Sequence, residues 1–170
     1  MAREDYEAVI GLEVHAELST KTKIFCSCPT TFGAEPNTHV CPICMAMPGT
    51  LPVLNEKVVE YAVKAGLATN CEISKDSKND RKNYYYPDLP KGFQITQETK
   101  PAPVGIYGSI DYECNGEIKT AKINNIHLEE DSAATDHQAN YSTIDYNRAG
   151  VPLLELVTEP VFLSLIHISE

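Results

Sequence analysis

The sequence predicts an α+β fold in which a mainly antiparallel sheet is combined with few helices. Segments with strand-like alternation recur along the chain, whereas only residues 55–69 have a convincing helical period. The clearest local signal is Asn115 followed by Gly116, which joins two extended runs at residues 106–114 and 117–123. This pair favours a two-residue type I′ turn, so these runs are predicted to form a hairpin.

The first predicted strand lies within residues 8–18, where an apolar run gives way to alternation. Its apolar face would carry Leu12, Val14, Ala16 and Leu18, and its other face Glu13, His15 and Glu17. This pattern indicates a half-buried strand with two carboxylates and an imidazole side by side. Residues 19–53 contain Cys, Pro, Gly and Thr without a sustained period, which indicates an excursion held together by metal.

The predicted helix has a capping residue, Asn55, and an acidic residue, Glu56, in its first turn. It is followed by a polar turn region at residues 74–80 and an extended aromatic stretch at 81–86, which Pro87 and Pro90 end. The apolar stripe of the helix comprises Val58, Val59, Ala62, Val63 and Gly66.

Further strands are expected at residues 93–97, around 141–146 and at 151–158, with a polar loop at 132–141. Glu155 interrupts an apolar run in the last of these strands. Residues 126–131 also alternate, with Ile126 and Leu128 opposed to His127, Glu129 and Asp131.

Composition narrows the class of protein. A net charge of -10, from 24 acidic and 14 basic residues, argues against a self-sufficient nucleic-acid-binding module. The N-terminus has no secretory signal and no apolar run is long enough to span a bilayer. We therefore expect a cytoplasmic protein without a membrane partner, in which clustered cysteines indicate metal rather than disulfides.

Four cysteines form two short chelating pairs, Cys26 with Cys28 and Cys41 with Cys44. Paired spacing of this kind suits a closed, structural zinc site with four thiolates. Free thiols remain the main alternative, and His39 is a less favoured substitute ligand. Cys71 and Cys114 stand alone and are predicted to be buried structural residues.

Acidic residues form a second candidate group. Glu13 and His15 share a strand face, Glu129 and Glu130 are consecutive, and Glu155 lies in an apolar run. Such a set of hard ligands favours Mg²⁺ or Mn²⁺ over zinc, although the spacing alone is more typical of solvent-facing strand residues and a surface run of acids.

Three cations lie near aromatic residues or glycine: Arg81, Lys82 and Arg148. They suit either phosphate oxygens or a solvated surface. The sequence has no P-loop and no kinase-type glycine-rich loop, so an ATP site here would be of another kind.

Several strings in order and at matching spacing resemble the start of the aspartyl/glutamyl-tRNA(Asn/Gln) amidotransferase B-subunit family. They are residues 9–15 (VIGLEVH), 32–37 (FGAEPN), 47–52 (MPGTLP), 80–84 (DRKNY) with 86–88 (YPD), 127–131 (HLEED), 147–148 (NR) and 155–160 (ELVTEP). The resemblance covers about residues 5–160. It implies a catalytic domain of the glutamine-synthetase-like cradle type within residues 1–160, with a zinc-binding insert at about 24–48.

The resemblance also implies a reaction, the ATP-dependent repair of misacylated tRNA by a glutamine-hydrolysing carbon–nitrogen ligase. This subunit would phosphorylate the side-chain carboxylate of Glu on tRNA(Gln) or of Asp on tRNA(Asn). Ammonia released from glutamine by an A subunit would then displace phosphate, and a small C subunit would complete a heterotrimer.

Carried over by position, the resemblance makes Glu13, His15, Glu130 and Glu155, with Glu129 as an alternate, the expected magnesium ligands. Lys82 is the expected contact to phosphate or carboxylate, with Arg81 and Arg148 as further candidates, and the four cysteines match the zinc-binding branch of the family. Residues 161–170 depart from the family pattern, and the chain by itself is expected to be inactive in amidation. The alternative is a non-catalytic, zinc-stabilised scaffold domain that binds the A subunit.

Overall fold

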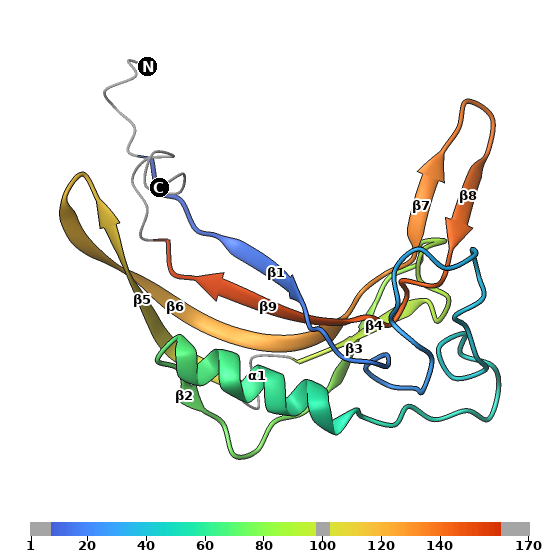
Figure 1. Ribbon diagram of the computed structural model, residues 1–170, viewed down its shortest axis with the longest axis horizontal. Helices are drawn as coiled ribbons and strands as arrows, with labels where there is room; N and C mark the ends of the chain where they lie inside the picture. The colour runs from blue at the N-terminus through green and yellow to red at the C-terminus, as the bar shows by residue number, and fades with distance from the viewer. Residues whose placement is uncertain (1–7, 98–102, 161–170) are drawn as a thin grey trace.

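The computed structural model describes residues 8–97 and 103–160, and it confirms a mainly antiparallel α+β architecture (Figure 1). One seven-stranded sheet has the order β1-β9-β6-β4-β3, with β5 paired to β6 and β2 paired to β5, and a separate hairpin is formed by β7 and β8. The strands are β1 (Glu13–Glu17), β2 (Glu72–Ile73), β3 (Asp80–Asn83), β4 (Phe93–Thr96), β5 (Gly105–Cys114), β6 (Glu117–Glu130), β7 (Ala134–His137), β8 (Ser142–Asp145) and β9 (Pro152–Thr158).

Strand β6 is the centre of the sheet. Its 14 residues pair antiparallel with β5, β9 and β4, so it joins elements that are far apart in the sequence. The sheet is curved, and the helix α1 (Glu56–Ala68) lies against its convex face (Figure 1). The opposite, concave face is therefore left without a covering helix in the described part of the chain.

The helix forms where the sequence predicts it. The side chain of Asn55 accepts a hydrogen bond from the backbone N–H of Lys57, which caps the first turn, and Thr69 ends the helix. Its buried residues, Val58, Ala62 and Gly66, belong to the predicted stripe. Val58 and Ala62 join a core with Ile126, Leu128 and Leu154 from the convex face of β6 and β9, together with Ile24, Phe25, Cys71, Ile95, Val104 and Ile123.

The predicted hairpin is also confirmed. Asn115 and Gly116 have φ angles of 55° and 76°, as a type I′ turn requires, and Cys114 pairs with Glu117 across the turn. The strand after the turn is longer than expected, because the alternating segment at 126–131 continues it as far as Glu130.

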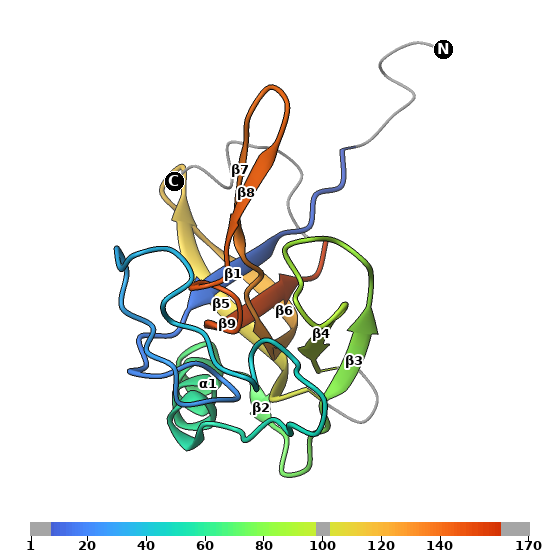
Figure 2. The ribbon, with the colours of Figure 1, turned by 90° about the vertical axis from the view of Figure 1, so that its right-hand side faces the viewer.

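Two expectations about strands were wrong. All five residues of β1 are exposed and none belongs to the main core cluster, although Leu18, just after the strand, packs against that cluster. The predicted loop at 132–141 contains β7, which pairs with β8 to form a hairpin that projects from the sheet (Figure 2). Strand β3 ends at Asn83, so the exposed Tyr84, Tyr85 and Tyr86 follow the strand rather than belong to it.

Between β1 and α1 the chain forms neither a helix nor a named strand. Backbone hydrogen bonds attach it to its surroundings, among them those from Ile24 N to Gly150 O and from Asn55 N to Ile24 O, of 3.0 and 2.9 Å. The atypical segment 161–170 lies outside the described residues. No helix within the described ranges is long and apolar enough to cross a membrane.

The contact between the end of α1 and β5 leaves no room for a side chain at Gly108. A Cβ atom there would lie 2.4 Å from Cys71 Sγ and 2.7 Å from Thr69 O. We predict that Gly108→Ala destabilises the fold by about 1–3 kcal/mol, the usual cost of overpacking. Urea unfolding measures this loss.

Gly11→Ala is the matched control, because a Cβ at Gly11 would meet nothing closer than 3.7 Å. It should change the free energy of unfolding by less than about 0.5 kcal/mol. Equal stability of the Gly108→Ala and Gly11→Ala variants would contradict the packing described for β5.

Candidate functional site

Three strands place polar side chains in one row on the concave face. In the antiparallel register, Glu155 on β9 lies opposite His15 on β1 and opposite His127 on β6. Glu129 lies two residues after His127 on β6 and therefore on the same face. The register thus gathers residues that are more than a hundred positions apart in the chain.

The side chains of this row are in contact. His15 Nε2 lies 3.0 Å from Glu129 Oε1 and 3.2 Å from Glu155 Oε2, and His127 Nε2 lies 3.2 Å from the same Glu155 oxygen. The acids are largely buried, with side-chain exposures of 4% for Glu129 and 12% for Glu155, whereas His15 is open to solvent. We call His15, Glu129 and Glu155 the acidic cluster.

Burial and crowding set the protonation of this site. Burial raises the pKa of Glu129, and the charge of Glu155 raises it further. Burial also lowers the pKa of His127, so that its neutral form is favoured, and raises the pKa of Asp131. Two buried acids side by side are costly unless a cation compensates their charge.

Of the other predicted residues, the structure brings Glu13 and Lys82 to this face. Both line the same hollow as His15, Glu129 and Glu155, together with Tyr84 and Asp131. Lys82 is exposed on β3 and has no ion pair among the residues that the structure describes. Its charge is close enough to favour the ionised form of Glu129.

The structure separates Glu130 and Arg81 from this group. Alternation along β6 turns Glu130 to the other face, where its carboxylate accepts hydrogen bonds from Lys91 Nζ at 2.7 Å and from Ile95 N at 2.8 Å. Arg81 likewise points away from Lys82, and its guanidinium lies 5.2 Å from the centre of the Phe93 ring. Both residues line a cavity on the side of the four cysteines instead.

Arg148 has a supporting position beside the acidic cluster. Its guanidinium donates to the carbonyl oxygens of Ser132 and Ala133, at 2.9 and 3.0 Å, and lies 3.3 Å from Asp131 Oδ2. Because Asp131 and Ser132 line the hollow, Arg148 fixes the wall of the site in this structure rather than reaching into it.

His127 is a site residue that the sequence analysis did not single out. Asn124 Nδ2 donates to Glu159, so Asn124 Oδ1 accepts from Asn125 Nδ2, and Asn125 Oδ1 is left to accept from His127 Nδ1. Nδ1 of His127 therefore carries a proton, and in the protonated ring Nε2 would donate to Glu155 as well, at 3.2 Å. Strand alternation could have identified His127, because it places His127 on the same face as Glu129, which was already a candidate ligand.

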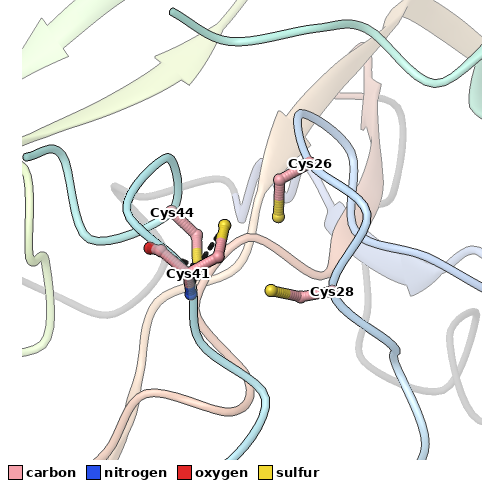
Figure 3. Close-up of side chains that lie close together, drawn as sticks. All are labelled: Cys26, Cys28, Cys41 and Cys44. Carbon is pink, nitrogen blue, oxygen red and sulfur yellow. Dashed lines mark hydrogen bonds between the residues drawn. The ribbon is translucent and has the colours of Figure 1, made fainter. Parts of the chain in front are cut away.

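The four cysteines come together as the sequence predicts (Figure 3). Their sulfur atoms lie within 4.8 Å of one another, and Cys41 Sγ and Cys44 Sγ are 3.8 Å apart. Four sulfurs at about 2.3 Å from a zinc ion would be about 3.8 Å apart, so the donor set fits tetrahedral zinc. His39 is not part of this group, and Cys71 and Cys114 are buried elsewhere as expected.

The thiols differ in acidity because they are packed against one another. A hydrogen bond from Cys26 lowers the pKa of Cys44 to about 4, and the Cys41 N–H and the Lys23 ammonium act in the same direction. The same hydrogen bond, with burial, raises the pKa of Cys26, and burial raises that of Cys28 to about 11. Of these three thiols Cys44 gives up its proton most readily, and a metal ion would displace protons from the others.

The two groups suit different ions. The cysteines offer soft donors in a closed arrangement, typical of structural zinc. The acidic cluster offers carboxylate oxygens and one imidazole with an open, solvent-facing side, which suits Mg²⁺ or Mn²⁺ with room for a further ligand.

Comparison with known proteins assigns the chain to a family. The model of the family described as "GatB/GatE catalytic domain" matches residues 8–170. The chain is 62% identical over 156 residues to the B subunit of an aspartyl/glutamyl-tRNA(Asn/Gln) amidotransferase from Thermoanaerobacter pseudethanolicus, with 91% of this chain and 32% of that protein covered. Proteins of the same description from Clostridium tetani and Carboxydothermus hydrogenoformans are 60% and 56% identical, with 92% of this chain covered in both cases and 32% and 33% of those proteins. The chain thus spans about a third of the length of these relatives.

We predict that the acidic cluster binds Mn²⁺ more weakly as the pH falls. A cation requires the ionised carboxylate, and the raised pKa of Glu129 lets a proton compete at a higher pH than at an ordinary carboxyl group. Electron paramagnetic resonance of Mn²⁺ between pH 8 and pH 5, with the cysteines saturated with zinc, measures this dependence.

Glu129→Gln should weaken Mn²⁺ binding by about tenfold or more, a loss expected even for an outer-sphere partner. Glu17→Gln is the control, since Glu17 is exposed on β1 and lies outside the cluster. Binding that is independent of pH, or equal in the two variants, would exclude the cluster as the ion site.

Proposed function

Because the chain belongs to the GatB/GatE catalytic domain family, we propose that it carries the carboxylate-activating site of the B subunit of a tRNA-dependent amidotransferase. The observation that carries this proposal is the acidic cluster on the concave face, with Lys82 beside it. A buried pair of acids next to an exposed cation is an arrangement that can hold a divalent ion and receive phosphate oxygens.

The proposed reaction is the one that the family resemblance of the sequence implies, and it agrees with carboxylate chemistry. An oxygen of the side-chain carboxylate of Glu on tRNA(Gln), or of Asp on tRNA(Asn), attacks the γ-phosphorus of ATP, and ADP leaves. The acyl phosphate then has a good leaving group, which a carboxylate lacks. Ammonia from glutamine, supplied by an A subunit, attacks the acyl carbon and releases phosphate, with a C subunit completing the heterotrimer.

Each residue of the site has a proposed task. Lys82 places a positive charge beside the hollow and would hold an oxygen of the phosphate or carboxylate. His15, Glu129 and Glu155 would hold Mg²⁺, with Glu13 at the rim of the same hollow. When bound, Mg²⁺ supplies charge neutralisation on the transferred phosphoryl group.

The remaining predicted residues have supporting tasks. The ion pair with Lys91 makes Glu130 a structural residue of the opposite face, and Arg148 holds the wall formed by Asp131 and Ser132. The four cysteines would hold a structural zinc ion, which takes no part in the phosphoryl transfer.

We predict that Lys82→Met in the full-length subunit, assembled with its A and C partners, lowers ATP-dependent amidation by about 10²- to 10³-fold, the usual cost of losing one preorganised charge contact to the reacting group. Glutamine hydrolysis by the A subunit should be retained, which shows that the complex is assembled. Lys78→Met is the control, because Lys78 is exposed and paired with Asp80. Unchanged amidation in Lys82→Met would refute the task given to Lys82.

We also predict that the 170-residue chain alone does not support amidation when it is mixed with A and C subunits, because it spans about a third of the length of its relatives.

A Mg·ATP binding measurement on the full-length subunit distinguishes a catalytic domain from a scaffold. Nucleotide affinity that is lost in Glu129→Gln favours the catalytic domain, and the absence of any nucleotide affinity favours the scaffold.

A further inference from the structure

A buried lysine lies beside the four cysteines. Lys23 has 0% exposure, and its ammonium lies 3.9 Å from Cys44 Sγ and 3.1 Å from the carbonyl oxygen of Tyr146. Glu130 lines the same cavity, but its carboxylate is paired with Lys91, and no ion pair joins it to Lys23. Among the described residues, the group nearest to this ammonium that can carry a negative charge is therefore Cys44 Sγ, which would do so as a metal ligand.

Electrostatics explains why this contact matters. An ammonium group without a counter-charge costs several kcal/mol to bury, and one carbonyl dipole compensates only part of that cost. A zinc ion bound by four thiolates carries a net charge of about -2, which is also costly to bury. Each charge offsets the burial cost of the other.

We propose that Lys23 is the internal counter-ion of the four-cysteine centre. Its ammonium and the Cys41 N–H, which lies 3.2 Å from Cys44 Sγ, would both donate to this sulfur when metal is bound. Outer-sphere donors of this kind orient metal ligands and adjust their basicity. The proposal concerns the cysteine centre alone and does not depend on the proposed amidation.

The backbone of Lys23 supports this position. Its N–H donates to Cys28 O at 2.9 Å, so that Lys23 contacts the first cysteine pair through its backbone and the second pair through its side chain. The same ammonium reaches Tyr146, and the next residue along, Ile24, donates to Gly150 O at 3.0 Å. Lys23 therefore joins both halves of the centre to the segment that carries Arg148.

The test is the zinc affinity of Lys23→Met, which keeps the length of the side chain and removes its charge. We expect binding about tenfold weaker than in the unchanged chain, measured by competition with a chelator. With Co²⁺ in place of zinc, the sulfur-to-metal charge-transfer band should move to lower energy, because thiolate sulfur that has lost a cationic donor gives up electrons more readily. Lys23→Arg should recover most of the affinity.

Two controls separate this role from general damage. Lys21→Met removes an exposed lysine two residues away, and Val58→Ala weakens the core without touching the centre, so both should keep the zinc affinity and the Co²⁺ band. An unchanged affinity and an unchanged band in Lys23→Met would overturn the proposal.

If Lys23→Met does not fold, Lys23→Gln replaces it, because this side chain is also neutral and is shorter. The Co²⁺ band of Lys23→Gln should lie at lower energy than that of Lys23→Arg, which keeps the positive charge. Equal band energies in these two variants would overturn the proposal.

Discussion

The register between β9 and its two neighbours is the constraint on which the site depends. Glu155 lies opposite His15 on one side and opposite His127 on the other. A shift of one residue would turn Glu155 towards α1 and bring Leu154 or Leu156 to the concave face, with loss of both the core and the acidic cluster. Packing of the convex face against the helix therefore fixes the geometry of the polar face.

Strand β6 shows how one segment serves two faces. Ile126 and Leu128 pack into the core, while His127 and Glu129 lie among the polar side chains of the concave face. The consecutive acids Glu129 and Glu130 are separated by the same alternation, one into the cluster and the other into an ion pair with Lys91. Adjacent residues of similar chemistry thus have different tasks.

The segment at residues 19–53, which carries the four cysteines, contacts the site from outside the sheet. Asn37 donates to Ile144 O and accepts from Tyr146 N, while Asn147 donates to Glu35 O, so the loop at 35–37 is attached to the segment after β8. That segment continues to Arg148, which holds the wall of the hollow. Residues 19–53, which form no helix or named strand, are attached to the rest of the fold by these and by backbone hydrogen bonds.

Features that depend on neighbouring residues could be predicted from the sequence. The helix from Glu56 to Ala68, the turn at Asn115 and Gly116, and the pairing of cysteines two and three residues apart each have a local physical cause, and each is confirmed. Which acids meet depends on the tertiary structure, because strand order and register bring His15, Glu129 and Glu155 together across long separations. Local alternation shows that two residues share a face, but not which face is buried. It therefore predicted a buried face for β1, whose residues are exposed. It also could not select His127 or separate Glu130 and Arg81 from the cluster.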